Sequence, residues 1–298
     1  MKIVRVNKAG FFAEVHDMDC RRPLTSQEKM EIEDAIARYG VLVFKNQSLR
    51  NDEHIAFAIH FGEVEAEPVN TGRTRLTETK LNDISNLNAD GSLMKADDRR
   101  RMFSLGNRLW HSDSSFKTVP ASYSFLFAHV VPPHGGETEF ADMRAAWDAL
   151  PVDQRTRLTK LDAWHSLLYS RELLGFSDFN ADERAKYAPV RHPMSRVHPI
   201  SGRRSLFISS HIGRVEGMLV PEGKELIRDL MESATQREFV HSHSWSVGDL
   251  VMWDNRCTMH RGRPFDDQRH PRDLRRVTLV DASYGKTPQP TSIFASTA

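Results

Sequence analysis

The chain has 298 residues and nearly balanced charge, with 41 Lys and Arg against 40 Asp and Glu and a net charge of +1. A chain of this length can bury a large core, and we expect one domain over residues 1–298 because no Pro-, Gly- or Ser-rich linker, low-complexity segment or repeat divides it. The near-neutral charge provides no electrostatic footprint for nucleic acid, which we exclude as a partner.

Cysteine content and apolar runs restrict the class of protein further. The two cysteines, Cys20 and Cys257, are too few for a disulfide framework or a Cys-rich metal site. The first residues lack the apolar stretch of a signal peptide, and no apolar run approaches the length of a membrane span. We therefore expect a protein of a reducing compartment, the cytoplasm, with no membrane partner.

The predicted elements are many short strands and a few helices. β-prone runs within residues 2–18 predict strands near the N-terminus. The segment from Thr25 to Glu28 has a capping-box pattern that opens a helix, Gly40 ends this helix, and the apolar run 41–44 suits a buried strand. Further helices are predicted at 54–60, 142–150, 153–160 and 221–233, and further strands at 122–131, 196–200, 203–210, 239–245, 248–253 and 275–283. This pattern favours a mainly β protein with peripheral helices and a double-stranded β-helix, or jelly-roll, core.

Two segments are less regular. The basic run 99–101 directly follows Asp97 and Asp98, so we interpret it as a solvated loop rather than a basic patch. Residues 166–189 mix aromatic and charged residues and fit neither helical nor strand periodicity. This stretch is either a lid or an oligomer contact, since binding function concentrates on loops, or a surface excursion packed by its own aromatics. The sequence leaves both open.

The triplet His111-Ser112-Asp113 is the candidate metal-binding feature. On a β-strand, residues two apart project to the same face, so His111 and Asp113 can bind one ion while Ser112 points away. A histidine from a distant strand, His260, would complete a 2-His-1-carboxylate set. Such a set leaves three coordination positions open and suits non-heme Fe(II) oxygen chemistry. Taken alone, the triplet is also typical of a hydrogen-bonded polar pair at a strand edge.

Other histidines offer competing ligand sets. His241 and His243 are also two residues apart and could chelate a metal, but no carboxylate stands nearby in register, so we interpret them as a structural pair. His198 and His211 flank the predicted strand 203–210. Either could line a pocket, and packing explains either one equally well.

The sequence blocks around the triplet and around His260 resemble the Fe(II)/2-oxoglutarate-dependent dioxygenases of the taurine dioxygenase superfamily. Within it they are most similar to the 2,4-dichlorophenoxyacetate (aryloxyacetate) dioxygenase branch. The resemblance covers nearly the whole chain and implies the same jelly-roll fold. Its blocks are 41–44, 61–62, 83–86, 110–115, 122–128, 132–146, 234–240, 248–255, 258–262 and 275–278.

The resemblance also implies how the cosubstrate is held. Fe(II) would be bound by His111, Asp113 and His260, with 2-oxoglutarate and O2 at the open positions. Arg272 stands twelve residues after His260, where the superfamily has the arginine that binds the distal carboxylate of 2-oxoglutarate. A guanidinium suits this role because it is permanently charged and donates a bidentate fork. Thr138 would add a hydroxyl.

A second arginine would hold the anionic group of the substrate, and this role corresponds to Arg276. Arg275 is the competitor, since neighbouring residues on a strand face opposite ways and only one of the two can point inward. Asn107 and the backbone amide of Ser112 would add polar contacts, and Lys95 is a weaker candidate for the carboxylate.

The resemblance predicts an enzyme that hydroxylates an aryloxyacetate at the carbon beside the ether oxygen. The products would be a phenol and glyoxylate, together with succinate and CO2. Apolar side chains of the 61–80 and 92–105 loops would contact the ring. Alternatives are the same enzyme class acting on a sulfonate, sulfate ester or other aromatic carboxylate, and a metal-binding jelly-roll protein without turnover. Relatives are commonly homo-oligomers, so we expect one here.

Overall fold

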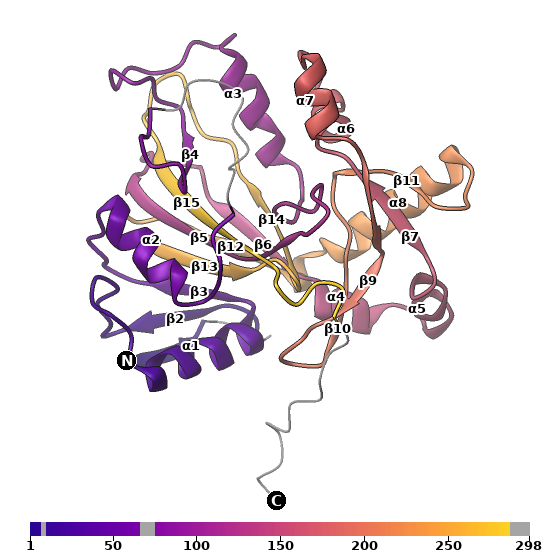
Figure 1. The fold of residues 1–298 in the computed structure, drawn as a ribbon, viewed down its shortest axis with the longest axis horizontal. Helices are drawn as coiled ribbons and strands as arrows, with labels where there is room; N and C mark the ends of the chain where they lie inside the picture. Colours follow the sequence, from indigo (N-terminus) through magenta and orange to yellow (C-terminus); the bar gives the residue numbers. More distant parts are fainter. Residues whose placement is uncertain (7–9, 66–74, 287–298) are drawn as a thin grey trace, which may run out of the picture.

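The computed structural model describes residues 1–6, 10–65 and 75–286, and its centre is a seven-stranded sheet (Figure 1). Neighbouring strands are antiparallel except for the second and third, which are parallel. In order across the sheet the strands are β1 (Lys2–Arg5), β2 (Ala13–His16), β3 (Val41–Phe44), β13 (Leu250–Asp254), β5 (Ala121–Val130), β15 (Asp273–Val280) and β4 (Asn82–Ser85).

Smaller sheets and helices complete the described part of the chain. A three-stranded sheet has the order β12 (Val240–His243), β6 (Thr138–Asp142) and β14 (Thr258–Gly262). Two further sheets comprise β11 (Ile212–Val215), β7 (Asp162–His165) and β8 (Val190–Pro193), and β10 (Arg204–Leu206) with β9 (Ser195–Val197). The helices are α1 (Ser26–Tyr39), α2 (Asn51–Ile59), α3 (Arg99–Ser104), η1 (Leu105–Arg108), α4 (Met143–Ala149), α5 (Val152–Leu158), α6 (Leu167–Glu172), α7 (Ala181–Lys186), α8 (Val220–Ala234) and η2 (Arg237–Phe239). None of the helices in the described ranges is long and apolar enough to cross a membrane.

Strand alternation gives each face of the seven-stranded sheet its own core. Met252 of β13 packs in a buried cluster with Ile36 of α1 and Phe57 of α2, so these helices cover one face. The next residue, Trp253, faces the opposite way and packs in a second cluster with Phe140 of β6, their ring centroids 5.6 Å apart. The three-stranded sheet therefore lies against the other face. This strand-rich architecture with peripheral helices agrees with the sequence prediction.

The first predicted helix is confirmed in detail. Glu28 donates its backbone N–H to the Thr25 hydroxyl at 3.2 Å, and the Glu28 carboxylate accepts from the Thr25 N–H at 3.0 Å, which is the predicted capping box. Gly40 ends the helix in the left-handed conformation at φ 72°. The helix predicted at 54–60 begins earlier, at Asn51. Strands β4, β7, β8 and β11 were not predicted, because each is only four residues long and lacks clear alternation.

The prediction of a solvated loop at 99–101 is wrong, since these residues open helix α3. The Asp98 side chain caps this helix by accepting from the Arg100 N–H at 2.8 Å. Arg99 pairs with Glu183 at 2.9 Å and Arg101 pairs with Asp267 at 3.0 Å. The first and last arginines of the basic run are thus held by acidic partners far away in the sequence, which a local composition argument cannot detect.

Residues 166–189 form α6 and α7, which stand beside α3 in the upper part of the molecule (Figure 1). The aromatic side chains of the segment do pack together, as one of the two alternatives proposed, and the cluster extends to α3. Its buried members are Phe103, Phe116, Leu167, Phe176, Phe179 and Tyr187. The segment therefore forms one wall of the region around His111, and its role as a lid stays a prediction.

Candidate active site

His111 and His260 are brought together by a backbone pairing. The N–H of His111 donates to the carbonyl of His260 at 3.0 Å, and the N–H of His260 donates to the carbonyl of His111 at 2.8 Å. Directly opposed residues of an antiparallel pair place their side chains next to each other. The imidazole centroids accordingly lie 4.3 Å apart. His260 belongs to β14, whose register is fixed by its pairing with β6.

Asp113 reaches the two histidines from a turn rather than from a strand, which corrects the local geometry expected at 111–113. Only His111 makes a β-bridge, and the chain then turns through Ser114 at φ 54°. The turn is held because the Asp113 N–H donates to Asn255 Oδ1 at 3.0 Å. The Ser112 hydroxyl points elsewhere and donates to the carbonyls of Asn255 and Thr258 at 2.8 and 3.0 Å.

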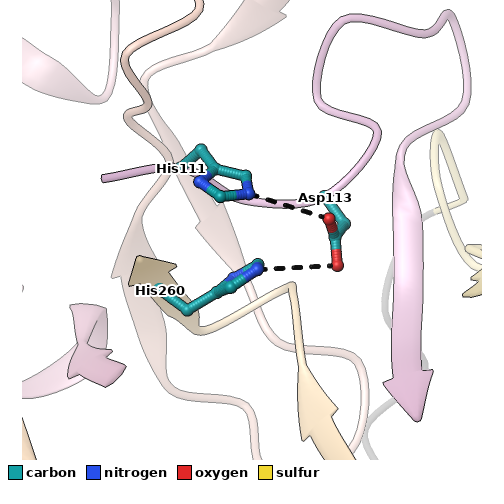
Figure 2. A group of neighbouring side chains, drawn as sticks. All are labelled: His111, Asp113 and His260. Atoms are coloured by element: carbon teal, nitrogen blue, oxygen red, sulfur yellow. Dashed lines mark ion pairs between the residues drawn. The ribbon is translucent and has the colours of Figure 1, made fainter. Parts of the chain in front are cut away.

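The three side chains converge on one point (Figure 2). His111 Nε2 lies 3.9 Å from Asp113 Oδ1, and His260 Nε2 lies 3.8 Å from Asp113 Oδ2. His111 Nδ1 lies 2.7 Å from the Leu109 carbonyl, so it carries the proton and leaves Nε2 with a free lone pair. Burial lowers the pKa of both imidazoles, and for His260 the neighbouring His111 lowers it further. Both are neutral at pH 7, as metal ligands must be.

Asp113 is held ionised by its neighbours. Burial opposes ionisation, but the Arg276 guanidinium, helped by the hydrogen bond from Ser124, outweighs burial, so the pKa of Asp113 lies below its ordinary value. Arg276 Nη1 donates to Asp113 Oδ1 at 2.5 Å, and the Ser124 hydroxyl donates to Oδ2 at 2.7 Å. Asn255 Nδ2 in turn donates to Ser124 at 3.0 Å. The sequence analysis missed both Ser124 and Asn255, since neither stands in a recognisable ligand pattern.

This donor set fits a divalent transition metal. One ligand atom from each of His111, Asp113 and His260 lies within 4.8 Å of the others, and all three residues are buried. Two neutral imidazole nitrogens and one carboxylate oxygen are the donors of non-heme Fe(II) sites, and they leave three positions for other ligands. A second group in the described ranges, His198, Asp254 and Cys257, also meets this distance criterion. This second group suits a metal less well, because Arg256 binds both oxygens of Asp254, at 2.8 and 2.7 Å, and His198 Nε2 is already 2.8 Å from one of them. Burial also raises the pKa of the Cys257 thiol to about 12, so the thiol stays protonated at neutral pH.

A cavity beside the triad, here the first cavity, contains Arg272 and Thr138 together with His260. Arg272 Nε is buried without a hydrogen-bond partner in the described structure, and Nη2 makes only a long 3.4 Å contact to the Gly136 carbonyl. Burial lowers the pKa of Arg272 to about 10, so the guanidinium is still a cation at neutral pH. The Thr138 hydroxyl accepts from Trp245 Nε1 at 3.0 Å, which leaves its proton to donate into the cavity. These groups can receive a carboxylate.

Residues 6–278 match the family described as "Taurine catabolism dioxygenase TauD, TfdA family". The chain belongs to this dioxygenase family. It is 50% identical over 273 residues to the alpha-ketoglutarate-dependent 2,4-dichlorophenoxyacetate dioxygenase of Cupriavidus pinatubonensis, covering 91% of this chain and 95% of the relative. It is 38% identical over 246 residues to the (S)-phenoxypropionate/alpha-ketoglutarate-dioxygenase of Sphingobium herbicidovorans, covering 80% and 81%. The solved structure of AAD-2 in complex with Mn(II) and N-oxalylglycine has a TM-score of 0.87 and 46% identity, covering 94% of this chain and 98% of that one. The resemblance inferred from the sequence is confirmed.

Adjoining the first cavity, this dioxygenase chain has a second cavity, which shares His111 and Arg276 with the first. It also contains His211, whose ring centroid lies 5.9 Å from that of His111, and Arg171 of α6. The sequence analysis left His211 open between pocket and packing and did not single out Arg171. No motif marks either residue.

Of the remaining residues predicted to bind substrate, some line the cavities and others do not. Arg276 faces both cavities, whereas Arg275 points away and donates to Asn51 Oδ1 at 2.6 Å and Asp273 Oδ2 at 3.0 Å. Asn107 lines both cavities. Lys95 is exposed and lines neither cavity, because its buried neighbour Met94 takes the inward position.

Two other expectations concern segments around the site. Of the 61–80 loop, residues 66–74 lie outside the described residues, so the predicted ring contacts there stay a prediction. The expectation that no carboxylate lies near the His241/His243 pair is wrong, since His243 Nε2 is 3.3 Å from Asp249 Oδ2. That carboxylate also pairs with Lys45 at 2.7 Å, and the His241 ring packs against the Phe12 ring with their centroids 3.9 Å apart. The pair therefore fits the structural interpretation.

Proposed function

We propose that this chain is an Fe(II)- and 2-oxoglutarate-dependent dioxygenase that hydroxylates an aryloxyacetate such as 2,4-dichlorophenoxyacetate. The attacked carbon would be the one between the ether oxygen and the carboxylate, and the hemiacetal formed there collapses to a phenol and glyoxylate. The observation that carries the proposal is the buried His111, Asp113 and His260 set beside a cavity that contains Arg272, whose buried Nε has no hydrogen-bond partner in the described structure. The 50% identity to a 2,4-dichlorophenoxyacetate dioxygenase supports the substrate class.

Different side chains around the ion would bind the cosubstrate and the substrate. When bound, Fe(II) with 2-oxoglutarate and O2 supplies the oxidant for the C–H bond, while 2-oxoglutarate becomes succinate and CO2. Arg272 and Thr138 would hold the distal carboxylate of 2-oxoglutarate, one by charge and the other by a hydroxyl hydrogen bond. Arg276 would orient the substrate carboxylate, and Asn107 would add a polar contact, so that one C–H bond is presented to the centre.

Three broader features belong to the same proposal. The pair of packed sheets would be a jelly-roll core, and residues 1–298 would be one domain. A polar contact from the Ser112 amide and cytoplasmic location stay predictions. The small-molecule substrate would be bound by a homo-oligomer without nucleic-acid or membrane partners.

The test is turnover by the Fe(II)-reconstituted protein. It would be incubated with 2-oxoglutarate and a panel of aryloxyacetates, aryl sulfonates and alkyl sulfate esters, with succinate and the released phenol as readouts. We expect aryloxyacetates to give equal amounts of phenol and succinate. The neutral amide of the same acid should be a poor substrate. Equal turnover of acid and amide would contradict the proposed substrate class, because it would mean that the pocket does not recognise a carboxylate.

A further inference from the structure

The second cavity contains a buried cation that the proposed chemistry has not used. Arg171 of α6 is only 5% exposed, and its Nε is buried without a hydrogen-bond partner in the described structure. Its Nη1 donates to the Ser170 hydroxyl at 3.2 Å, and its guanidinium lies over the Phe103 ring at 4.5 Å. Among the described ion pairs none involves Arg171. A buried charge without an opposite charge is costly, so its retention calls for a ligand.

The backbone is shaped to admit this guanidinium. A Cβ built on Gly106 of η1 would lie 2.1 Å from the Arg171 Cζ, so only a residue without a side chain can stand there while the guanidinium keeps its place. Gly106 and Phe103 both lie directly against the guanidinium. The position of Arg171 is therefore defined by close packing rather than by a salt bridge.

Other charged groups around the second cavity have partners of opposite charge. Glu65 pairs with Lys117 at 2.7 Å, and Asp83 pairs with Arg75 at 2.9 Å. Arg100 likewise pairs with Asp98 at 2.7 Å. Arg171 differs from these groups because none of the described ion pairs gives it a partner of opposite charge.

Arg276 is the second cation that faces this cavity. One of its nitrogens is used on Asp113, and its Nε is buried without a partner in the described structure. Burial and the charge of Arg276 lower the pKa of Arg171 to about 10, which leaves Arg171 cationic at neutral pH. Two cations that repel each other across a cavity next to the metal ligands are both stabilised by one anion between them.

We propose that Arg171 is a substrate-binding residue that holds the carboxylate of the substrate together with Arg276. This inference rests on the proposed function and deepens it, since it explains how the site would select an anionic substrate. The pattern repeats that of Arg272 in the first cavity, whose guanidinium also has a buried Nε without a hydrogen-bond partner in the described structure. Two guanidiniums without an acidic partner among the described ion pairs thus match the two carboxylates of the reaction, one in the cosubstrate and one in the substrate.

The main test is Arg171→Gln in the Fe(II)-loaded enzyme. We expect the KM for 2,4-dichlorophenoxyacetate to rise roughly a hundredfold, because a charge-assisted contact in a desolvated site is lost. The KM for 2-oxoglutarate should stay within about twofold. Turnover of the neutral amide should change little, so the variant should no longer prefer the acid over the amide. Calorimetric titration of the Mn(II)- and 2-oxoglutarate-loaded protein with the same acid gives a readout independent of turnover.

A second variant keeps the arginine and moves it. Gly106→Ala should displace the guanidinium, since the flexible end of the side chain is what the new methyl group meets. Gly106→Ala should reproduce much of the rise in the KM for the acid that is expected for Arg171→Gln. The double variant should have a KM for the acid no higher than that of Arg171→Gln alone. The matched control is Arg184→Gln, whose half-exposed guanidinium donates to the carbonyls of Phe179 and Ser177 in the same segment. It should lower stability without changing the preference for acid over amide.

The outcomes separate this inference from the proposed function. If the wild type turns over a sulfonate or sulfate ester instead of an aryloxyacetate, the proposed substrate is wrong, and Arg171→Gln should then impair that anion. Unchanged KM for whichever anion the wild type uses would overturn the role of Arg171. An equal loss for acid, amide and 2-oxoglutarate together with a lower Tm would also overturn it, because that result describes a structural residue. A wild type that uses none of the anions would overturn both.

Discussion

The two adjoining cavities next to the triad, the cosubstrate side and the substrate side of the site, are constructed differently. On the cosubstrate side, Thr138 lies on β6, which pairs with the strand of His260, and Arg272 directly precedes β15. On the substrate side, Asn107 and Arg171 come from short helical segments, η1 and α6, packed around an aromatic cluster. Strand register fixes the first side, while packing between distant segments fixes the second. The common chemistry therefore depends on rigid strands, and the choice of substrate depends on segments that can vary without disturbing them.

The largest effect should come from the three candidate metal ligands, because the ion that they would hold serves both the cosubstrate side and the substrate side. We expect His111→Ala, Asp113→Ala and His260→Ala each to abolish turnover, because each removes one of three protein ligands to the ion. Succinate formation and bound iron per chain are the measurements. Asp113→Glu serves as a conservative control and should retain a trace, since the longer arm can still reach the metal. Near-normal succinate formation by any alanine variant would contradict the metal assignment.

The next largest effect should fall on cosubstrate binding and leave substrate binding nearly unchanged. Arg272→Ala should raise the KM for 2-oxoglutarate roughly a hundredfold, about 3 kcal/mol, because a charge-assisted contact to a carboxylate is lost. Thr138→Ala should act in the same direction by about 1 kcal/mol for one hydrogen bond. The KM for the aryloxyacetate should change little in either variant. If 2-oxoglutarate affinity survived in Arg272→Ala, the cosubstrate side would have been assigned to the wrong cavity.

The sequence also predicted the residues of the cosubstrate side better than those of the substrate side. The resemblance implied that His260, Arg272 and Thr138 belong to one site, and the structure brings all three to the first cavity. Their roles in binding the cosubstrate stay predictions. The preference for Arg276 over Arg275 also agrees with the structure, since neighbouring strand residues face opposite ways.

Contacts made across long sequence distances were not predictable. Nothing around Arg171 shows that a glycine 65 positions earlier would leave room for its guanidinium. The helix at 99–101 was missed for the same reason, since its acidic partners Glu183 and Asp267 lie far along the chain. Even the triplet was only partly understood, because Asp113 is positioned by Asn255 rather than by a strand.

A smaller effect is expected at Arg276, which serves both the metal ligand and the substrate side. Arg276→Ala should lower product formation by roughly thirtyfold, about 2 kcal/mol for hydrogen bonds to charged groups. Succinate should fall less than product, because 2-oxoglutarate can still be consumed while the target C–H bond is misplaced. Arg275→Ala is the matched control, since its guanidinium points away from the cavities to Asn51 and Asp273. Equal falls in succinate and product would indicate that Arg276 acts only through Asp113.

The smallest effect concerns Ser124, which contacts Asp113 but lines neither of the two cavities. Ser124→Ala removes the 2.7 Å hydrogen bond to Asp113 Oδ2 and leaves Asn255 Nδ2 without its acceptor. Groups that orient a metal ligand typically change metal affinity by tenfold or more when they are lost, so we expect iron affinity to fall about tenfold. At saturating Fe(II) the KM values for both 2-oxoglutarate and the aryloxyacetate should be unchanged, since Asp113 lies between the two sides. Iron titration followed by kinetics at saturation measures both. A selective change in one KM would mean that Ser124 belongs to one side of the site rather than to the metal ligand.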